Sequence, residues 1–165
     1  MPNHIKNIVD FSDFSTNQFK KIQDEICGDE ILDDGEKRLF DFLKIIPAPD
    51  HLIYPLEDYA STKHPLNWYN WNREHWGTKW NSYDLSDWKK QRISFYTAWN
   101  MPDPIFKALS LKYPKSKIEV SFADEDIGRN CGMAIYRAGV RINYFEWDNH
   151  SYMACKFARM VRGAK

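Results

Sequence analysis

Three consecutive carboxylates, Asp124, Glu125 and Asp126, are the residues in this sequence that most resemble a metal site. Clustered carboxylate oxygens are the ligands that Mg²⁺ and Mn²⁺ prefer, and Asp84 or His75 would complete the shell of a metal-dependent hydrolase. The spacing matches no calcium-binding loop, however, and consecutive side chains usually point in different directions. A solvated turn is therefore the simpler interpretation.

Other catalytic arrangements find no support in the sequence. No two histidines have His-x-x-x-His spacing, although His75 beside Glu74 has the composition of an acid/base pair. The three cysteines, Cys27, Cys131 and Cys155, form no Cys-x-x-Cys motif. Nucleophile motifs and glycine-rich phosphate loops do not occur either. We therefore expect a protein without a cofactor and see no positive evidence for an enzyme.

The segment from Trp76 to Asp84 mixes aromatic rings with polar groups around a glycine. Exposed Trp and Tyr side chains beside polar groups anchor binding partners well, because they bury a large area at a small entropic cost. We expect a binding surface formed by Trp76, Thr78, Lys79, Trp80, Asn81, Tyr83 and Asp84. The alternative is structural: the two tryptophans would cover a sheet edge, and Asn81 and Asp84 would hydrogen-bond the loop to itself.

The 165 residues carry 23 basic and 23 acidic side chains, so the long-range attraction typical of nucleic-acid-binding proteins is missing. Residues 1–100 hold 12 basic and 16 acidic side chains, and residues 101–165 hold 11 and 7. Near the end, Lys156, Arg159, Arg162 and Lys165 recur every third residue and would form a basic stripe on a helix. Nucleic-acid binding is thus an alternative that the neutral net charge disfavours. The stripe also has a structural explanation, because cations near a helix C-terminus complement the helix dipole.

Local patterns predict the first elements of the fold. Residues 4–11 alternate in polarity as a strand does. Ser15 and Gln18 have the spacing of a capping box at the start of a helix that Gly28 ends. A short second strand is expected over residues 39–43.

An irregular insertion is expected at about residues 45–90, which hold four prolines and five of the seven tryptophans. Inside it, the spacing of Trp68, Trp71 and His75 predicts a short helix from Leu66 to His75.

The second half of the chain returns to regular structure. We expect a strand over residues 92–99, a helix that Asp103 caps and Pro114 ends, a strand over residues 118–122, a hairpin of residues 133–136 and 140–144, and a helix over residues 151–162. The closing helix is expected to bury Met153, Phe157, Met160 and Val161.

Two strand-helix-strand units that pack their helices on one face of an antiparallel sheet define the ferredoxin-like α+β sandwich. We expect residues 1–165 to form one such domain. RNA-recognition modules stack bases on a sheet of this kind, and aromatic residues occur in the expected strands: Phe95, Tyr96, Tyr136, Tyr144 and Phe145. The glycine-and-aromatic signature of those modules is missing, so core packing explains most of these rings.

Four stretches give the sequence its individual character: Met1-Pro2-Asn3-His4; Ile45-Ile46-Pro47-Ala48-Pro49 after Phe42; Trp76-Gly77-Thr78-Lys79-Trp80-Asn81-Ser82-Tyr83-Asp84; and Phe95-Tyr96-Thr97-Ala98-Trp99 followed by Pro102 and Pro104. Together they resemble the YubB ferredoxin-like domain family. The resemblance implies a ferredoxin-like protein carried by phages and conjugative plasmids of bacteria, with no established activity and no catalytic residue.

These features favour a non-catalytic accessory protein of a bacterial mobile element, which binds and modulates a host protein such as a defence or regulatory system. Residues 1–6 lack the blocks of a signal peptide, and no apolar run approaches the roughly 18 residues of a membrane span. We therefore expect the protein in the cytoplasm of the bacterial host. An RNA- or single-stranded-DNA-binding domain and a metal-dependent hydrolase are the alternatives.

Overall fold

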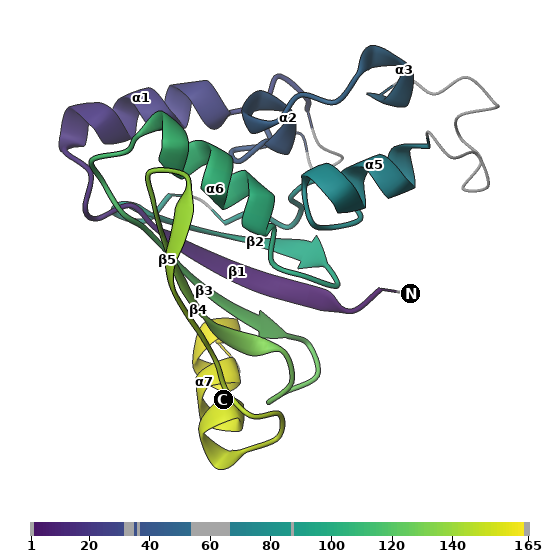
Figure 1. Ribbon diagram of the computed structural model, residues 1–165, viewed down its shortest axis with the longest axis vertical. Coiled ribbons are helices and arrows are strands. Elements are labelled where there is room, and N and C mark those ends of the chain that lie inside the picture. Colours follow the sequence, from purple (N-terminus) through teal and green to yellow (C-terminus); the bar gives the residue numbers. More distant parts are fainter. Residues whose placement is uncertain (1, 32–34, 36, 54–66, 87, 164–165) are drawn as a thin grey trace.

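A five-stranded antiparallel sheet in the order β2-β1-β3-β4-β5 forms the centre of the fold (Figure 1). The structure, a computed structural model, describes residues 2–31, 35, 37–53, 67–86 and 88–163. The strands are β1 (His4–Asp10), β2 (Arg92–Ala98), β3 (Ile118–Asp124), β4 (Cys131–Arg137) and β5 (Val140–Glu146). Because β1 lies between β2 and β3, the β2-α6-β3 unit is a split β-α-β unit of the ferredoxin-like kind.

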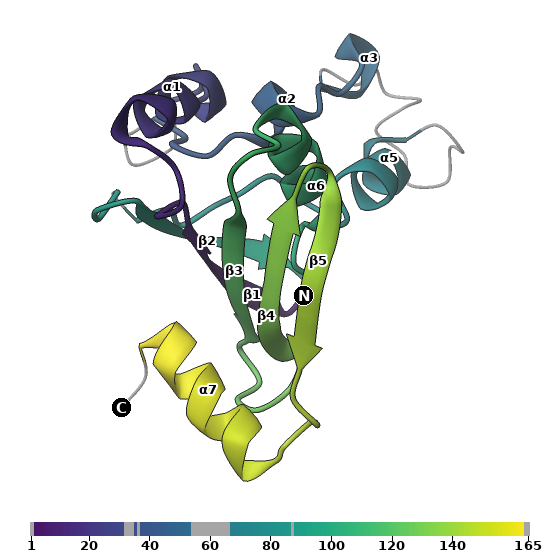
Figure 2. The ribbon, with the colours of Figure 1, turned by 60° about the vertical axis from the view of Figure 1, so that its left-hand side comes forward.

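The helices lie on both faces of this sheet. On one face are α1 (Thr16–Ile26), α2 (Phe42–Ile45), α3 (Asp50–Ile53), α5 (Trp68–His75) and α6 (Asp103–Lys112), whereas α7 (Tyr152–Arg162) lies alone on the other (Figures 1 and 2). The α+β ferredoxin-like class is confirmed. The expectation that the helices share one face is wrong for α7.

Two hydrophobic clusters follow from the alternation along the strands. Ile5 and Val9 of β1 are fully buried in the larger cluster, under α1 and α6. Ile8 faces the opposite side and packs with Ala123 and Phe157 in the smaller cluster under α7. Because β1 carries apolar residues on both faces, helices can pack on both sides of the sheet.

The capping box that opens α1 is present as predicted. Ser15 Oγ accepts a hydrogen bond from the backbone N–H of Gln18, and the Gln18 side chain accepts one from the N–H of Ser15. The helix buries Phe19, Ile22 and Ile26 and ends before Gly28. A local sequence signal was sufficient here, because capping groups and helix are contiguous in the chain.

The second strand predicted over residues 39–43 is wrong, because this segment turns into the short helix α2. Asp41 is its N-cap and accepts the backbone N–H of Leu43 at 2.9 Å. Phe40 and Phe42 are both fully buried, but against the sheet and α6 rather than as alternate residues of a strand.

Two details of the later helices differ from expectation. Asp103 is the first residue of α6 rather than its cap, and its carboxylate instead pairs with Lys107 and Arg141 and accepts the hydroxyl of the buried Tyr136. In α7, Phe157 and Val161 are buried as predicted, but Met153 and Met160 are exposed. Ala154 and Ala158 form the rest of the buried face. Their small side chains let the helix approach the sheet closely.

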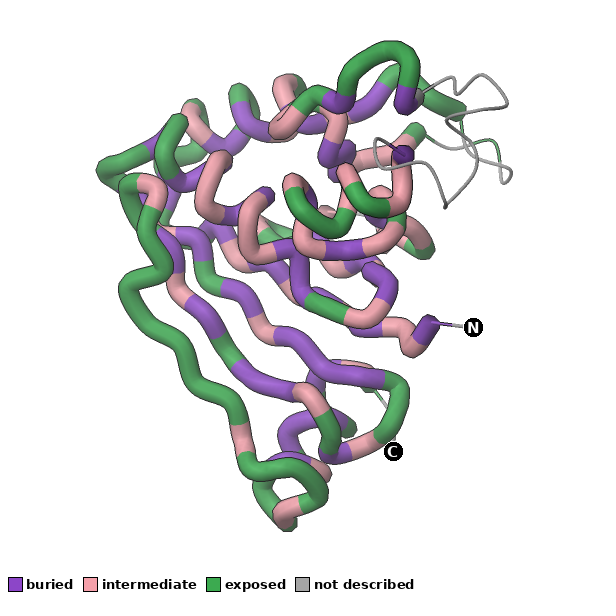
Figure 3. The backbone as a smooth tube through the Cα atoms, turned by 45° about the vertical axis from the view of Figure 1, so that its right-hand side comes forward, coloured by how far each residue is buried: buried purple, intermediate pink, exposed green. Residues whose placement is uncertain are grey.

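The hairpin β4–β5 is confirmed, with Ala138 and Gly139 at positive φ in its two-residue turn. All seven residues of β5 are exposed, and the strand forms a free edge of the sheet (Figure 3). The predicted helix of the insertion is α5, which begins at Trp68; its expected first residue, Leu66, lies outside the described residues. None of the helices in the described part of the chain has the length and apolar character needed to cross a membrane.

Candidate functional site

The segment from Trp76 to Asp84 contains residues that face inward and hold the fold together. Trp76 is 4% exposed, packs edge-on against Phe42 and Trp71, and donates its indole N–H to the carbonyl of Ile46 at 2.9 Å. Thr78 is also buried, and its hydroxyl both donates to and accepts from the backbone of Ala98. These two residues have structural roles.

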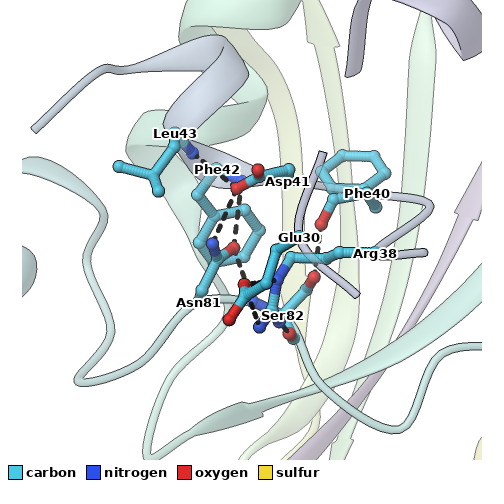
Figure 4. A network of polar contacts seen from close by, with 8 residues as sticks. All are labelled: Glu30, Arg38, Phe40, Asp41, Phe42, Leu43, Asn81 and Ser82. Carbon is cyan, nitrogen blue, oxygen red and sulfur yellow. Dashed lines mark hydrogen bonds and ion pairs between the residues drawn. The ribbon is translucent and has the colours of Figure 1, made fainter. Parts of the chain in front are cut away.

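Asn81 connects the segment to the start of α2 (Figure 4). Its Oδ1 accepts the backbone N–H groups of Phe42 and Ser82, and its Nδ2 donates to the Asp41 carboxylate at 2.7 Å. The same Asp41 caps α2, so a single carboxylate joins the helix start to the loop. The structural alternative for Asn81 therefore agrees with its contacts.

Ser82 and Arg38 complete this polar network (Figure 4). The buried Ser82 hydroxyl donates to the carbonyl of Phe40, and Arg38 donates to the carbonyl of Ser82 while it pairs with Glu30 at 2.9 Å. Hydrogen bonds of Asn81, Ser82 and Arg38 thus fix the backbone of the segment. Exposed side chains on this fixed backbone, such as Trp80, are pre-organised for binding.

Gly77 is required at the start of the segment. Its φ is +78°, and an added Cβ would lie 2.8 Å from Cδ of Pro104, so a larger residue would collide with the start of α6.

Lys79 and Trp80 face outward and meet rings from two other parts of the chain. Lys79 Nζ lies 4.6 Å from the ring centroid of Trp80, 5.4 Å from that of Trp99 and 5.9 Å from that of Tyr69. Such distances are within the range of cation–π attraction. We call these four residues the Lys79 cluster.

Trp99 is held in an unusual backbone conformation at the end of β2. Its φ is +70°, which bulky residues rarely adopt. Its backbone N–H donates to the carbonyl of Asn3 at 2.9 Å, and its carbonyl accepts from Asn130 Nδ2 at 3.2 Å. These bonds fix the ring of Trp99 beside Lys79.

Trp80 stands at the junction of two surface hollows. One has a volume of about 380 Å³ and is lined in part by Trp68, Asn72 and Leu52. The other has a volume of about 400 Å³ and reaches His4 and Tyr83. Trp80, with 36% of its surface exposed, lines both.

Tyr83 links the segment to the sheet. It pairs with Tyr96 through backbone hydrogen bonds and a stacked ring at 6.2 Å, and its hydroxyl lies 2.7 Å from Nδ1 of His4. Burial raises the pKa of Tyr83, and the negative charges of Asp84 and Glu125 raise it further. The phenol is therefore a neutral hydrogen-bonding group, and Asp84 next to it is exposed at a φ of +46°.

The acidic cluster does not form a metal site. Asp124 is buried, and its carboxylate accepts hydrogen bonds from Asn3 Nδ2 and from the backbone N–H of Asp126. His75 stacks on Trp71 at 4.3 Å. Within residues 2–31, 35, 37–53, 67–86 and 88–163, no three His, Cys, Asp or Glu side chains are placed to hold a metal ion together. The hydrolase hypothesis therefore has no geometric support.

The basic residues of α7 separate in space. Lys156 and Arg159 are exposed, whereas Arg162 is half-buried against the sheet and donates to the carbonyl of His4 at 3.2 Å. Lys165 lies outside the described residues. The predicted stripe thus contributes only Arg162 to the sheet surface, where Lys6 of β1 joins it.

Sequence reasoning missed Tyr69, Trp99, Arg38 and Lys6 as neighbours of the candidate site. Tyr69 and Trp99 lie on α5 and at the end of β2, so only the tertiary fold brings them to Lys79. Arg38 and Lys6 carried no local motif. Of the seven predicted binding residues, Trp76 and Thr78 are buried, and Asn81 both bonds to the backbone network and lines the two hollows. Lys79, Trp80, Tyr83 and Asp84 contribute to the surface.

The sheet order, the split β-α-β unit and the helices packed on the sheet define a ferredoxin-like α+β protein. The chain belongs to the family described as the ferredoxin-like domain in Api92-like protein, which matches residues 75–161. Strand β1 lies outside this matched segment, although it pairs between β2 and β3.

A crystal structure of a protein api92 from Yersinia pseudotuberculosis is similar in fold, with a TM-score of 0.52 at 15% sequence identity. The similarity covers 71% of this chain and 43% of that chain, so this chain spans less than half the length of the api92 structure. No curated protein matches the sequence.

Proposed function

We propose that this chain is a non-catalytic binding module, which docks on a partner protein through the surface around Trp80. The observation that carries the proposal is the position of Trp80, which is exposed at the junction of two hollows. Hydrogen bonds of Thr78 and Asn81 hold the backbone of its loop in place. A pre-organised indole loses little entropy on binding, and tryptophan is among the residues that most often dominate protein interfaces.

The charge of the surface supports a protein rather than a polyanion as the partner of Trp80. The positive group beside the indole, Lys79, is surrounded by aromatic rings. The hollows are bordered by the acidic Asp84 and Glu30 and by Arg38, whose charge is paired with Glu30. A mixed aromatic and polar surface of this kind is typical of protein interfaces.

The resemblance to the YubB ferredoxin-like family supports a narrower proposal. In it, the module is an accessory protein of a phage or conjugative plasmid and acts in the cytoplasm of a bacterium, where it binds and modulates a host protein of a defence or regulatory system.

Affinity capture from a bacterial lysate tests the docking proposal, with the wild-type chain, Trp80→Ala and Tyr152→Ala compared in parallel. Tyr152 is a matched control, because it is 78% exposed on α7, away from the Trp80 surface. We expect at least one protein that the wild type and Tyr152→Ala enrich and that Trp80→Ala does not.

Thermal melts establish that the Trp80→Ala variant is folded before its binding is compared. If no enriched protein depends on Trp80 while all three chains are folded, the docking proposal is wrong. If a Trp80-dependent protein is found, titration of the purified partner with the wild type and with Trp80→Ala gives the affinity lost with the indole.

A further inference from the structure

Two cationic side chains, Lys6 of β1 and Arg162 of α7, meet on the face of the sheet that α7 covers. Lys6 Nζ donates to the carbonyl of Arg162 at 3.4 Å, and Arg162 Nη1 donates to the carbonyl of His4 at 3.2 Å. Each side chain is therefore positioned by backbone of the neighbouring element. Both are half-buried, which limits the positions that they can adopt.

Among the described residues, this pair has no counter-charge. In the described part of the chain, the ion pairs join other residues, and none includes Lys6 or Arg162. Burial lowers the pKa of Lys6, and the positive charge of Arg162 lowers it further. Two like charges held together and partly removed from water are unfavourable, and a bound anion would reverse this.

Within the part of the chain that the structure describes, most hydrogen-bond donors of the pair also lack a protein acceptor. A guanidinium has five N–H donors and an ammonium three, and one of each is used in the contacts above. The fork of an arginine beside a lysine is well suited to the oxygens of a phosphate group.

Aromatic rings adjoin the two cations on the same face. Lys6 and Tyr96 are directly opposite in the pairing of β1 with β2, and the Arg162 guanidinium lies 5.6 Å from the Tyr96 ring centroid. Tyr96 in turn stacks on Tyr83, whose hydroxyl contacts His4. Two cations, Lys6 and Arg162, thus adjoin two half-buried phenol rings, Tyr96 and Tyr83. We call these four residues the basic strip.

We propose that Lys6 and Arg162 bind a phosphate group of single-stranded nucleic acid, with an adjoining base against Tyr96 and Tyr83. A single strand presents phosphates and the faces of unpaired bases together, whereas a duplex hides the faces of its bases. Asp84 and Glu125 add negative charge near Tyr83. The cations of the basic strip are Lys6 and Arg162, so we expect contacts to one or two phosphates. This inference goes beyond the Trp80 docking surface and does not depend on it.

Fluorescence anisotropy with a labelled oligothymidine of about twelve nucleotides tests the site. We expect binding in low salt, with log K falling against log salt at a slope of about −0.7 to −1.4, because a single strand releases about 0.7 counterion per phosphate contact. A blunt duplex of the same length should bind at least about five-fold more weakly, because its bases cannot stack on the tyrosines.

The variant Lys6→Gln with Arg162→Gln should lose about ten-fold or more in affinity and bring the slope close to zero. The matched control, Lys156→Gln with Arg159→Gln, removes the same charge from exposed positions of the protein and should bind within about two-fold of the wild type. If the first variant does not fold, the swap Lys6→Arg with Arg162→Lys keeps both charges and should retain binding.

Several outcomes would overturn the proposal. No binding at tens of micromolar protein would do so, as would equal losses from the two double variants, which would indicate general charge attraction. Competition by inorganic phosphate at the concentration of oligonucleotide phosphate would instead indicate a free-phosphate site, and equal binding of an oligoglutamate peptide would indicate a partner with acidic side chains.

Discussion

Neighbouring residues of the segment from Trp76 to Asp84 have opposite roles. Thr78 is buried and bonded to the backbone of β2, while Lys79 and Trp80 next to it form the surface. The segment is therefore neither wholly structural nor wholly a recognition loop, because its individual residues have different roles. The inward residues supply the rigidity that the outward residues need for binding.

At the start of α1, a single residue, Ser15, caps the helix, and its contribution can be measured as a change in the free energy of unfolding. Ser15→Ala removes the acceptor for the backbone N–H of Gln18 and one half of the capping box. We expect the free energy of unfolding to fall by about 1 kcal/mol. Urea denaturation measures it, with Thr16→Ala as a control that leaves the box intact; an equal effect of both substitutions would contradict this role of Ser15.

Residue types predicted the cap correctly but not the neighbours of Lys79. Ser15 and Gln18 lie three residues apart, so the sequence alone contains the interaction. Trp99 lies twenty residues beyond Lys79 and reaches it only because the backbone at Trp99 adopts a positive φ. No periodicity in the sequence encodes that conformation, since hydrogen bonds to distant Asn3 and Asn130 maintain it.

At the scale of elements, strands with strict alternation were predictable and the short helix α2 was not. Ile118, Val120 and Phe122 of β3 are buried on one face, as their spacing indicates. In the segment 39–43 the same kind of spacing is misleading, because a helix of four residues is too short to show a period of 3.6. The useful signal was Asp41, a residue type that commonly caps helices.

The helices α1 and α6 are joined by a polar contact that depends on pH. Glu25 of α1 accepts the Tyr113 hydroxyl and pairs with Lys112 at 2.8 Å. Burial works to raise the pKa of Glu25, but the hydrogen bonds and charges of Lys112 and Tyr113, with Lys21, outweigh it and hold the pKa below its usual value.

A carboxylate with a lowered pKa stabilises the fold above its unfolded pKa, about 4.3, and this contribution is lost as the pH falls through the folded pKa. We therefore expect Glu25→Gln to weaken the dependence of stability on pH below about pH 4.5 and to lower stability at pH 7. Urea unfolding across this range measures both effects. Glu119→Gln, which removes a carboxylate from an exposed position of β3, is the matched control.

At the scale of the whole molecule, the sheet is covered thickly on one face and by a single helix on the other (Figure 2). The sequence predicted α7 but not its location, because half of its contact face consists of Ala154 and Ala158, which resemble neutral helix positions. Elements with few buried apolar contacts open more readily than the rest of a fold. We infer that α7 can separate from the sheet while β1 and α1 stay folded.

Because Arg162 is on α7 and Lys6 is on β1, the proposed phosphate site exists only while α7 is docked. A ligand that binds only the docked state stabilises it by RT ln(1 + [L]/Kd), which is about 1.4 kcal/mol at ten times Kd. Amide hydrogen exchange in α7 should therefore slow about ten-fold when oligothymidine is added at that concentration. The Lys6→Gln with Arg162→Gln variant should show no slowing, and a slowing in that variant equal to the slowing in the wild type would contradict the proposed site.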